Sequence, residues 1–110
     1  YEALLLERDA AQHVHRSVAP LADAAVSLSC PGPAPLWGGD KDGEPMVARP
    51  TGDAIFNYPS SMLFAPVISI PVLAAGGLPV GVQVIGQQDE DARMTGLARW
   101  LWENTAPVSV

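Results

Sequence analysis

Residues 66–86 read Pro-Val-Ile-Ser-Ile-Pro-Val-Leu-Ala-Ala-Gly-Gly-Leu-Pro-Val-Gly-Val-Gln-Val-Ile-Gly, and this stretch decides the fold of the 110-residue chain. Residues 67–72 are largely β-branched and almost wholly apolar, which is typical of a strand. Residues 80–85 repeat valine at every second position, the period of a second strand. The two glycines and the proline within 74–79 interrupt helices and strands alike, so this segment is predicted to be the turn between them.

The predicted hairpin needs cover on both faces, because nearly every residue of its two strands is apolar. The rest of a 110-residue chain offers few elements that could supply this cover. Only 16% of the residues are charged, against roughly a quarter in a typical domain. We therefore expect a segment whose surface is partly internal to a larger protein or a homo-oligomer.

Upstream of the hairpin, the sequence predicts a helix and a strand. A helix is expected over 1–18, where four apolar residues fall on one face: Leu4, Ala11, Val14 and Val18. Pro20 ends this helix, because proline lacks a backbone donor. A strand is expected over 23–30, where Val26, Leu28 and Cys30 alternate with serines. Repeated prolines and glycines predict a loop over 31–50.

The remaining elements complete an α/β fold. Ser60 or Ser61 is predicted to cap a short helical turn over 62–65. A longer helix is expected over 87–104, where acidic residues in the first turn precede an apolar stripe made of Met94, Leu97, Ala98, Leu101 and Trp102. The predicted architecture is a partial mixed sheet with helices packed on it.

Composition excludes several classes of partner. The formal net charge is −6 and no cluster of lysine and arginine occurs, so neither nucleic acid nor an anionic membrane surface is expected as a partner. No apolar run approaches the roughly 20 residues of a membrane-spanning helix. A single cysteine excludes an internal disulfide and favours a reducing, cytoplasmic compartment. The absence of phosphate-loop and dinucleotide motifs predicts no cofactor.

Residue patterns that could carry chemistry are weak. His13 and His15 are two positions apart on a helix and point in different directions, so they cannot share a metal ion. Asp40, Asp42 and Glu44 are spaced like the first ligands of a calcium-binding loop. The later ligand positions of such a loop do not follow them. No metal site is therefore expected. Cys30 lacks a neighbouring base in the sequence, and no nucleophile elbow surrounds the Ser60-Ser61 pair.

Five stretches, taken in order, resemble those of amidase signature enzymes. Residues 77–86, Gly-Leu-Pro-Val-Gly-Val-Gln-Val-Ile-Gly, are similar to the family's Gly-Leu-Pro-Val-Gly-Val-Gln-Leu-Ile-Gly segment. The other resembling stretches are residues 23–31 with Ala34-Pro35, Thr51-Gly52-Asp53 with Phe56-Asn57, residues 60–71, and the acidic helix at the end. The resemblance covers nearly the whole chain. One departure is Ala65, where the family usually has glycine before the proline.

The resemblance implies a fold and an activity, and it also implies that the catalytic residues are absent from this chain. It implies the C-terminal part of an α/β/α fold with a mixed sheet, and an enzyme that hydrolyses an amide or transfers its acyl group. The family's Ser–cis-Ser–Lys triad lies in the N-terminal two-thirds of its members, so no catalytic residue is expected in this chain. Lys41 is the only lysine here and matches no catalytic motif.

We therefore expect residues 1–110 to form a single segment of an amidase-like domain that is inactive alone. Its expected partners are the missing N-terminal part of the same enzyme and, in the intact protein, a small-molecule amide. Four residues are candidates for the substrate pocket: Trp37, Phe56, Met62 and Phe64. Trp37 could instead pack on the core or on a partner, as aromatic side chains in loops often do.

Two other functions stay open on the sequence alone. The first is a non-catalytic interaction or oligomerisation module that docks through the apolar hairpin, since exposed apolar strands favour strand addition. The second is a small thiol enzyme that uses Cys30 as its nucleophile.

Overall fold

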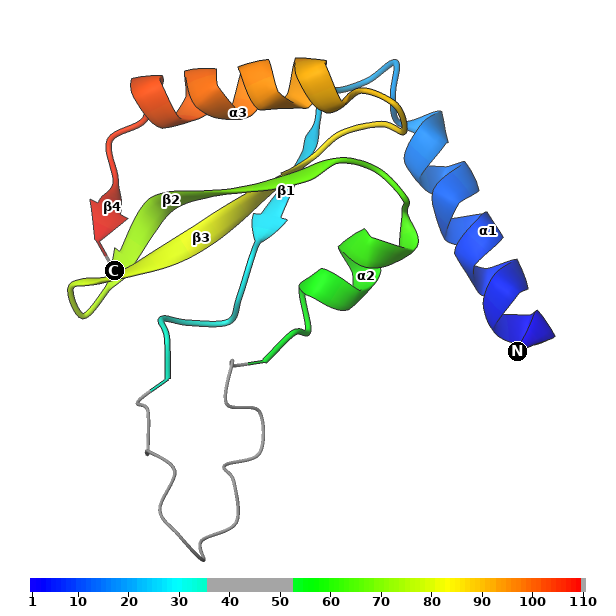
Figure 1. Cartoon of the computed structure of the whole chain (residues 1–110), viewed down its shortest axis with the longest axis horizontal. Coiled ribbons are helices and arrows are strands. Elements are labelled where there is room, and N and C mark those ends of the chain that lie inside the picture. Colours follow the sequence, from blue (N-terminus) through cyan, green and yellow to red (C-terminus); the bar gives the residue numbers. More distant parts are fainter. Residues whose placement is uncertain (36–52, 110) are drawn as a thin grey trace, which may run out of the picture.

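The computed structural model describes residues 1–35 and 53–109. Within them it has three helices and four strands (Figure 1). Their bounds are α1 Glu2–Ser17, β1 Ala25–Leu28, α2 Asn57–Met62, β2 Val67–Ala75, β3 Leu78–Ile85, α3 Asp91–Asn104 and β4 Val108–Ser109. The α/β class and the mixed sheet predicted from the sequence are confirmed. The acidic triplet 40–44, Lys41, Trp37 and the Thr51-Gly52 pair lie outside the described residues.

A two-residue turn joins β2 to β3. Gly76 and Gly77 have φ values of 57° and 80°, the left-handed region that glycine enters without steric cost and that tight hairpin turns require at both positions. Ala75 pairs directly with Leu78 on either side of the turn. Both strands therefore extend further into the segment 74–79 than the sequence predicted, and β3 includes Pro79.

The four strands form one sheet in the order β1-β3-β2-β4. β3 pairs antiparallel with both β1 and β2, while the short β4 pairs parallel with β2. β1 reaches only as far as Val82 on β3, so Pro79 lies where that side of β3 has no strand beside it, and its missing N–H group removes no ladder bond there. A bulge between Ile70 and Leu73 accommodates Pro71 within β2.

The core lies between the hairpin and α3, which runs along one face of the sheet (Figure 1). Its buried cluster contains three hairpin residues and two helix residues: Ile70, Val72, Val84, Met94 and Ala98. Met94 and Ala98 belong to the stripe predicted for this helix, whereas Trp102 from the same stripe is 59% exposed. The hairpin is thus the centre of the core, and its apolar side chains on this face are covered within the chain.

The helix α2 begins five residues before the predicted turn over 62–65, and that prediction was wrong. Pro59 lies in the first turn of α2, where backbone N–H groups have no intrahelical partner and proline is tolerated. The helix ends at Met62, and Phe64 then adopts a left-handed backbone with φ of 50°. Neither serine serves as a cap, because the N-cap residue is Phe56.

The predicted N-terminal helix is present as α1, but it buries no residue. Leu4 and Val14, from its predicted apolar face, are 62% and 63% exposed. Polar contacts connect α1 to the rest of the chain: His15 Nε2 lies 2.7 Å from the Gly86 carbonyl oxygen, and Gln87 Nε2 donates to the His15 carbonyl at 3.0 Å. Among residues 1–35 and 53–109, no helix has the length and apolar character to cross a membrane.

Candidate substrate-binding site

A cavity of about 430 Å³ lies between α1, α2 and the sheet. We call it the α2 pocket. No charged side chain is among the residues that line it, which are Ala11, Ser27, Phe56, Pro59, Ser60, Met62, Leu63, Gln83 and Ile85. Its volume falls within the range of roughly 300–1,000 Å³ that is usual for small-molecule sites. The composition suits an apolar ligand with a few polar contacts.

Gln83 lies in the wall that the sheet contributes to the α2 pocket. Its side chain is 2% exposed, and its Nε2 group lies 3.0 Å from the Leu28 carbonyl, 2.9 Å from the Phe56 carbonyl and 2.7 Å from Ser27 Oγ. Strand geometry places Gln83 opposite Val82 and Val84, which face α3. This one amide group therefore links β3 to the end of β1 and to the start of α2.

A second amide group holds the other end of α2. Gln12 Nε2, on α1, donates to the Met62 carbonyl at 2.8 Å. Six residues are too few for a helix to be stable by itself, so these contacts at Phe56 and Met62 fix its position. Ser60, buried inside α2, donates its hydroxyl to the carbonyl oxygens of Phe56 and Asn57 at 3.3 and 3.1 Å.

The structure brings together two of the four residues that the sequence proposed for a substrate pocket. Phe56 and Met62 both line the α2 pocket. Phe64 does not: it is 61% exposed, and the guanidinium carbon of Arg8 lies 5.0 Å from the centre of its ring. Trp37 lies outside the described residues. The first two are brought together because one short helix carries both.

Sequence reasoning missed the residue that organises the pocket. Gln83 interrupts the apolar strand 80–85, and a single polar residue on the inward side of a buried strand normally has a hydrogen-bonding role. The same reasoning could have found Ser27, which is opposite Gln83 in the sheet register. Ala11 lies on the apolar face predicted for the first helix, but its contribution to the pocket depends on how α1 is placed, which the sequence does not indicate.

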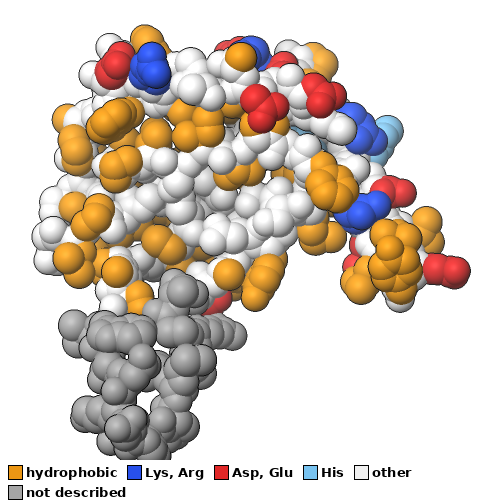
Figure 2. Space-filling view, viewed as in Figure 1, with side chains coloured by type: hydrophobic (Ala, Val, Ile, Leu, Met, Phe, Trp, Pro, Cys, Tyr) orange, Lys and Arg blue, Asp and Glu red, His pale blue; other side chains and the backbone are white. Residues whose placement is uncertain are grey.

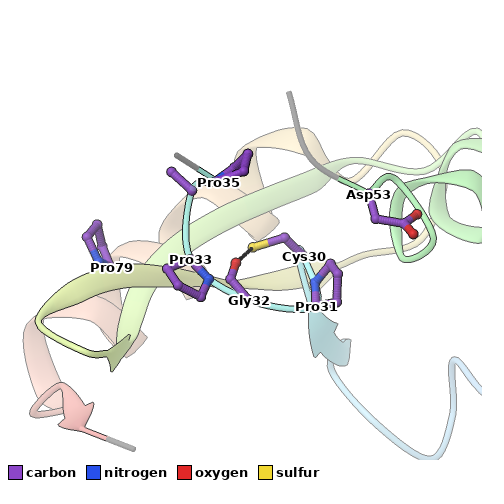
Figure 3. Close-up of a pocket in the computed structure, with 8 residues that line it drawn as sticks. Cys30, Pro31, Gly32, Pro33, Pro35, Asp53 and Pro79 are labelled. Carbon is purple, nitrogen blue, oxygen red and sulfur yellow. Dashed lines mark hydrogen bonds between the residues drawn. The ribbon is translucent and has the colours of Figure 1, made fainter. Parts of the chain in front are cut away.

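A second depression, of about 530 Å³, lies beside the end of β1 and is lined by residues 30–35 together with Asp53 and Pro79 (Figure 3). The Cys30 thiol donates a hydrogen bond to the Gly32 carbonyl oxygen at 2.9 Å (Figure 3). Proline side chains form much of the wall, and Figure 3 shows no basic side chain among its labelled residues. Among the described residues that line this depression, Asp53 carries the only charged side chain, so none of them supplies the cationic neighbour that a reactive thiol needs.

The remaining polar clusters are small. In residues 1–35 and 53–109, no three His, Cys, Asp or Glu side chains are grouped so that they could hold a metal ion. On the sheet, the hydroxyl oxygens of Ser29 and Ser69 lie 2.6 Å apart. Within the described part of the chain, neither hydroxyl has a basic side chain as its hydrogen-bond partner, so this pair has no general base of the kind that activates a serine nucleophile.

Known proteins match this chain in sequence. No family model matches it. A glutamyl-tRNA(Gln) amidotransferase subunit from Prosthecochloris aestuarii is 36% identical over 81 residues, which cover 72% of this chain and 17% of that protein. The corresponding subunit from Chlorobium chlorochromatii is 30% identical over 91 residues, which cover 82% of this chain and 19% of that protein. The chain thus spans less than a fifth of the length of these relatives.

A solved structure matches the fold. The crystal structure of an amidase superposes with a TM-score of 0.76 and 26% sequence identity, over 96% of this chain and 25% of the amidase. The sequence relatives and the structural neighbour agree with the five ordered stretches identified in the sequence. The chain is therefore similar to a portion of these amidase signature enzymes, in agreement with the resemblance found in the sequence.

Proposed function

We propose that this chain is the C-terminal portion of an amidase-type hydrolase, that it forms one wall of the substrate pocket, and that the catalytic residues belong to the rest of the enzyme. The observation that carries the proposal is the superposition of nearly the whole chain on a quarter of an amidase. The reaction is amide hydrolysis, in which the acyl group is transferred to water. Residues 1–110 act as one segment of the amidase-like domain, which works in the cytoplasm.

Surface exposure supports a large missing partner. Sixteen large apolar side chains among the described residues are exposed, whereas seven apolar side chains are buried. Figure 2 shows hydrophobic side chains spread over the surface rather than withdrawn from it. Apolar exposure of this extent marks surfaces that contact another protein segment. The N-terminal part of the same enzyme is the partner that we propose for this surface.

The environment of the described serines supports a segment without the catalytic centre. The Ser60 hydroxyl is directed at two backbone carbonyls of its own helix, and a hydroxyl that donates to a carbonyl is not activated for attack. An activated serine needs a base within hydrogen-bonding reach. In our proposal, the nucleophile and its base come from the missing part, and Phe56 and Met62 contact the substrate. Trp37 and Phe64 are the other two residues proposed from the sequence to contact the substrate in the intact enzyme.

A fluorophosphonate probe tests this proposal, because it labels activated serines. The probe is applied to this chain and to the full-length enzyme, and hydrolysis of an aryl amide is measured in parallel. We expect labelling and hydrolysis by the full-length enzyme and neither by this chain. Stoichiometric labelling of this chain at Ser60 or Ser61 would show that a complete site exists within its 110 residues.

The structure does not favour the alternative of a module that docks through the apolar hairpin. Ile70, Val72 and Val84 are buried against α3, so they are not available to a partner without unfolding of the core. Of the sixteen large apolar residues that remain exposed, seven lie on the helices, for example Leu6 on α1 and Trp100 on α3, and only Val67 and Leu78 lie on the hairpin.

A further inference from the structure

We propose that the α2 pocket binds the apolar substituent of an uncharged amide, and that Gln83 Oε1 accepts a hydrogen bond from the N–H group of that amide. The inference rests on the proposed function and names the substrate class for it. Three observations carry it: the lining of the pocket, the unused oxygen of a buried amide, and the attachment of α2 at both ends.

The lining selects against charge. Five of the nine side chains at the pocket are large and apolar or aromatic, namely Phe56, Pro59, Met62, Leu63 and Ile85, and none of the nine is charged. Transfer of an ionised group from water into such a site is strongly unfavourable unless a countercharge is present. The described lining offers none. A substrate with an ammonium or carboxylate group on its substituent is therefore disfavoured.

Gln83 supplies the polar contact. Its Nε2 group faces the Leu28 and Phe56 carbonyls, each within 3.0 Å. The reversed amide would place an oxygen against these two carbonyl oxygens, so the hydrogen-bond network fixes which atom is nitrogen. No described residue donates a hydrogen bond to Oε1. Oε1 therefore keeps its acceptor capacity, and an amide N–H group of a ligand in the pocket can donate to it.

The pocket is held open before any ligand arrives. Gln83 holds the start of α2 through the Phe56 carbonyl, and Gln12 holds its end through the Met62 carbonyl. The pocket walls that carry Phe56 and Met62 are thus fixed at both ends of the helix. Fixed walls lower the ordering cost of binding, so the volume of about 430 Å³ is available to the substituent of the amide.

The first test compares two amides of equal chain length in the full-length enzyme. Hexanamide and 6-aminohexanamide differ by one terminal ammonium group. We expect kcat/KM to be higher for hexanamide by about 100-fold, because the ammonium group loses its hydration in the pocket. Hydrolysis of both amides with equal or greater kcat/KM for 6-aminohexanamide would overturn the inference and leave the proposed function intact.

A charge placed in the pocket tests its location. Met62→Glu adds a carboxylate at a residue that is 36% exposed, and Val18→Glu adds one at a residue that is 37% exposed and outside the pocket. We expect Met62→Glu to reduce the preference for hexanamide by about tenfold or more. Val18→Glu should leave the preference unchanged. Equal effects of the two substitutions would contradict the assignment of the pocket.

A ligand without a donor tests the role of Gln83. Binding of hexanamide and N,N-dimethylhexanamide to the full-length enzyme is measured by calorimetry, which needs no turnover. Loss of one hydrogen bond should weaken binding of the dimethyl amide by about tenfold, and Gln83→Met should abolish this difference. A difference that persists in Gln83→Met would show that another group contacts the N–H.

The calorimetric test also separates the two proposals. Absence of probe labelling and of amide hydrolysis in the full-length enzyme would contradict the proposed function. Hexanamide binding that is sensitive to Met62→Glu would still support the pocket in that case. Absence of any binding would overturn the inference as well.

Discussion

Gly86 and Met94 are packed so closely that a Cβ atom on residue 86 would lie 2.1 Å from Met94 Cγ and 2.6 Å from its sulfur. Met94 is fully buried in the core. The Gly86 N–H group donates to the Pro66 carbonyl at 3.0 Å. The end of the hairpin therefore approaches α3 at a point where only a hydrogen atom fits.

We predict that Gly86→Ala destabilises the protein by about 1–3 kcal/mol, the usual cost of overpacking a core. Gly96→Ala is the matched control, because a Cβ atom at this exposed position of α3 meets nothing within 4 Å. That substitution should stabilise the helix by up to about 1 kcal/mol. Urea unfolding of the two variants measures both effects, and equal stabilities would contradict the packing described.

We predict that substitutions of Gly81 and Ser69 have coupled effects on stability. A Cβ atom on Gly81 would lie 2.5 Å from Ser69 Oγ and 2.9 Å from Ser29 Oγ, so Gly81→Ala should separate the two hydroxyls and destabilise the protein by about 1–3 kcal/mol. Part of this cost should disappear in the Ser69→Ala background, where the nearest atom is gone. Additive effects of the two substitutions in unfolding experiments would exclude the contact.

Phe64 has a backbone conformation that costs a residue with a Cβ atom about 1–2 kcal/mol. Its contact with Arg8 contributes roughly 0.5–1 kcal/mol in the opposite direction. We predict that Phe64→Gly is more stabilising in the Arg8→Ala background than in the native protein, by about the value of that contact. Ala65→Gly, at a position without positive φ, should give no gain. Thermal unfolding of the four variants measures the balance.

Gln83 should matter more for stability than Gln87, which is only partly buried. Gln83→Leu leaves the Leu28 and Phe56 carbonyls without their side-chain donor, and we expect a loss of about 2–4 kcal/mol. Gln87→Leu removes one hydrogen bond, to the His15 carbonyl, and should cost about 1 kcal/mol. Hydrogen exchange should be faster in α2 only for Gln83→Leu. Unchanged exchange in α2 would contradict the proposed attachment.

The sequence predicted the elements whose signals are local. Gly76-Gly77 between two apolar runs indicated the hairpin, and the stripe through Met94 and Ala98 indicated α3. The position of α2 was not predictable in this way, because Pro59 is normally a sign of helix termination and is tolerated only in the first turn. In the segment after α2, the residue with a positive φ is Phe64, and Ala65 is not among the residues with a positive φ.

Of the nine residues that line the α2 pocket, the sequence analysis named two, Phe56 and Met62, and the reason is physical. Phe56 and Met62 belong to one short helix, so a local argument about apolar residues near a motif was enough to group them. Gln83 and Ala11 reach the same pocket from β3 and α1, and their placement depends on tertiary contacts over long separations in the chain. Phe64 lies two residues beyond the end of α2, yet its side chain does not line the pocket: it is exposed and lies beside Arg8.

The two-residue turn at Gly76-Gly77 also sets an order of events in folding. The strands β2 and β3 are joined by the shortest practical connection, and hairpins of this kind form in about 1–10 μs. Pairing of β1 with β3 brings together Leu28 and Val82, which are far apart in the chain, and a long loop must close first. We expect the hairpin to be the early-formed part of this chain, onto which α3 condenses, while β1 and α1 join last.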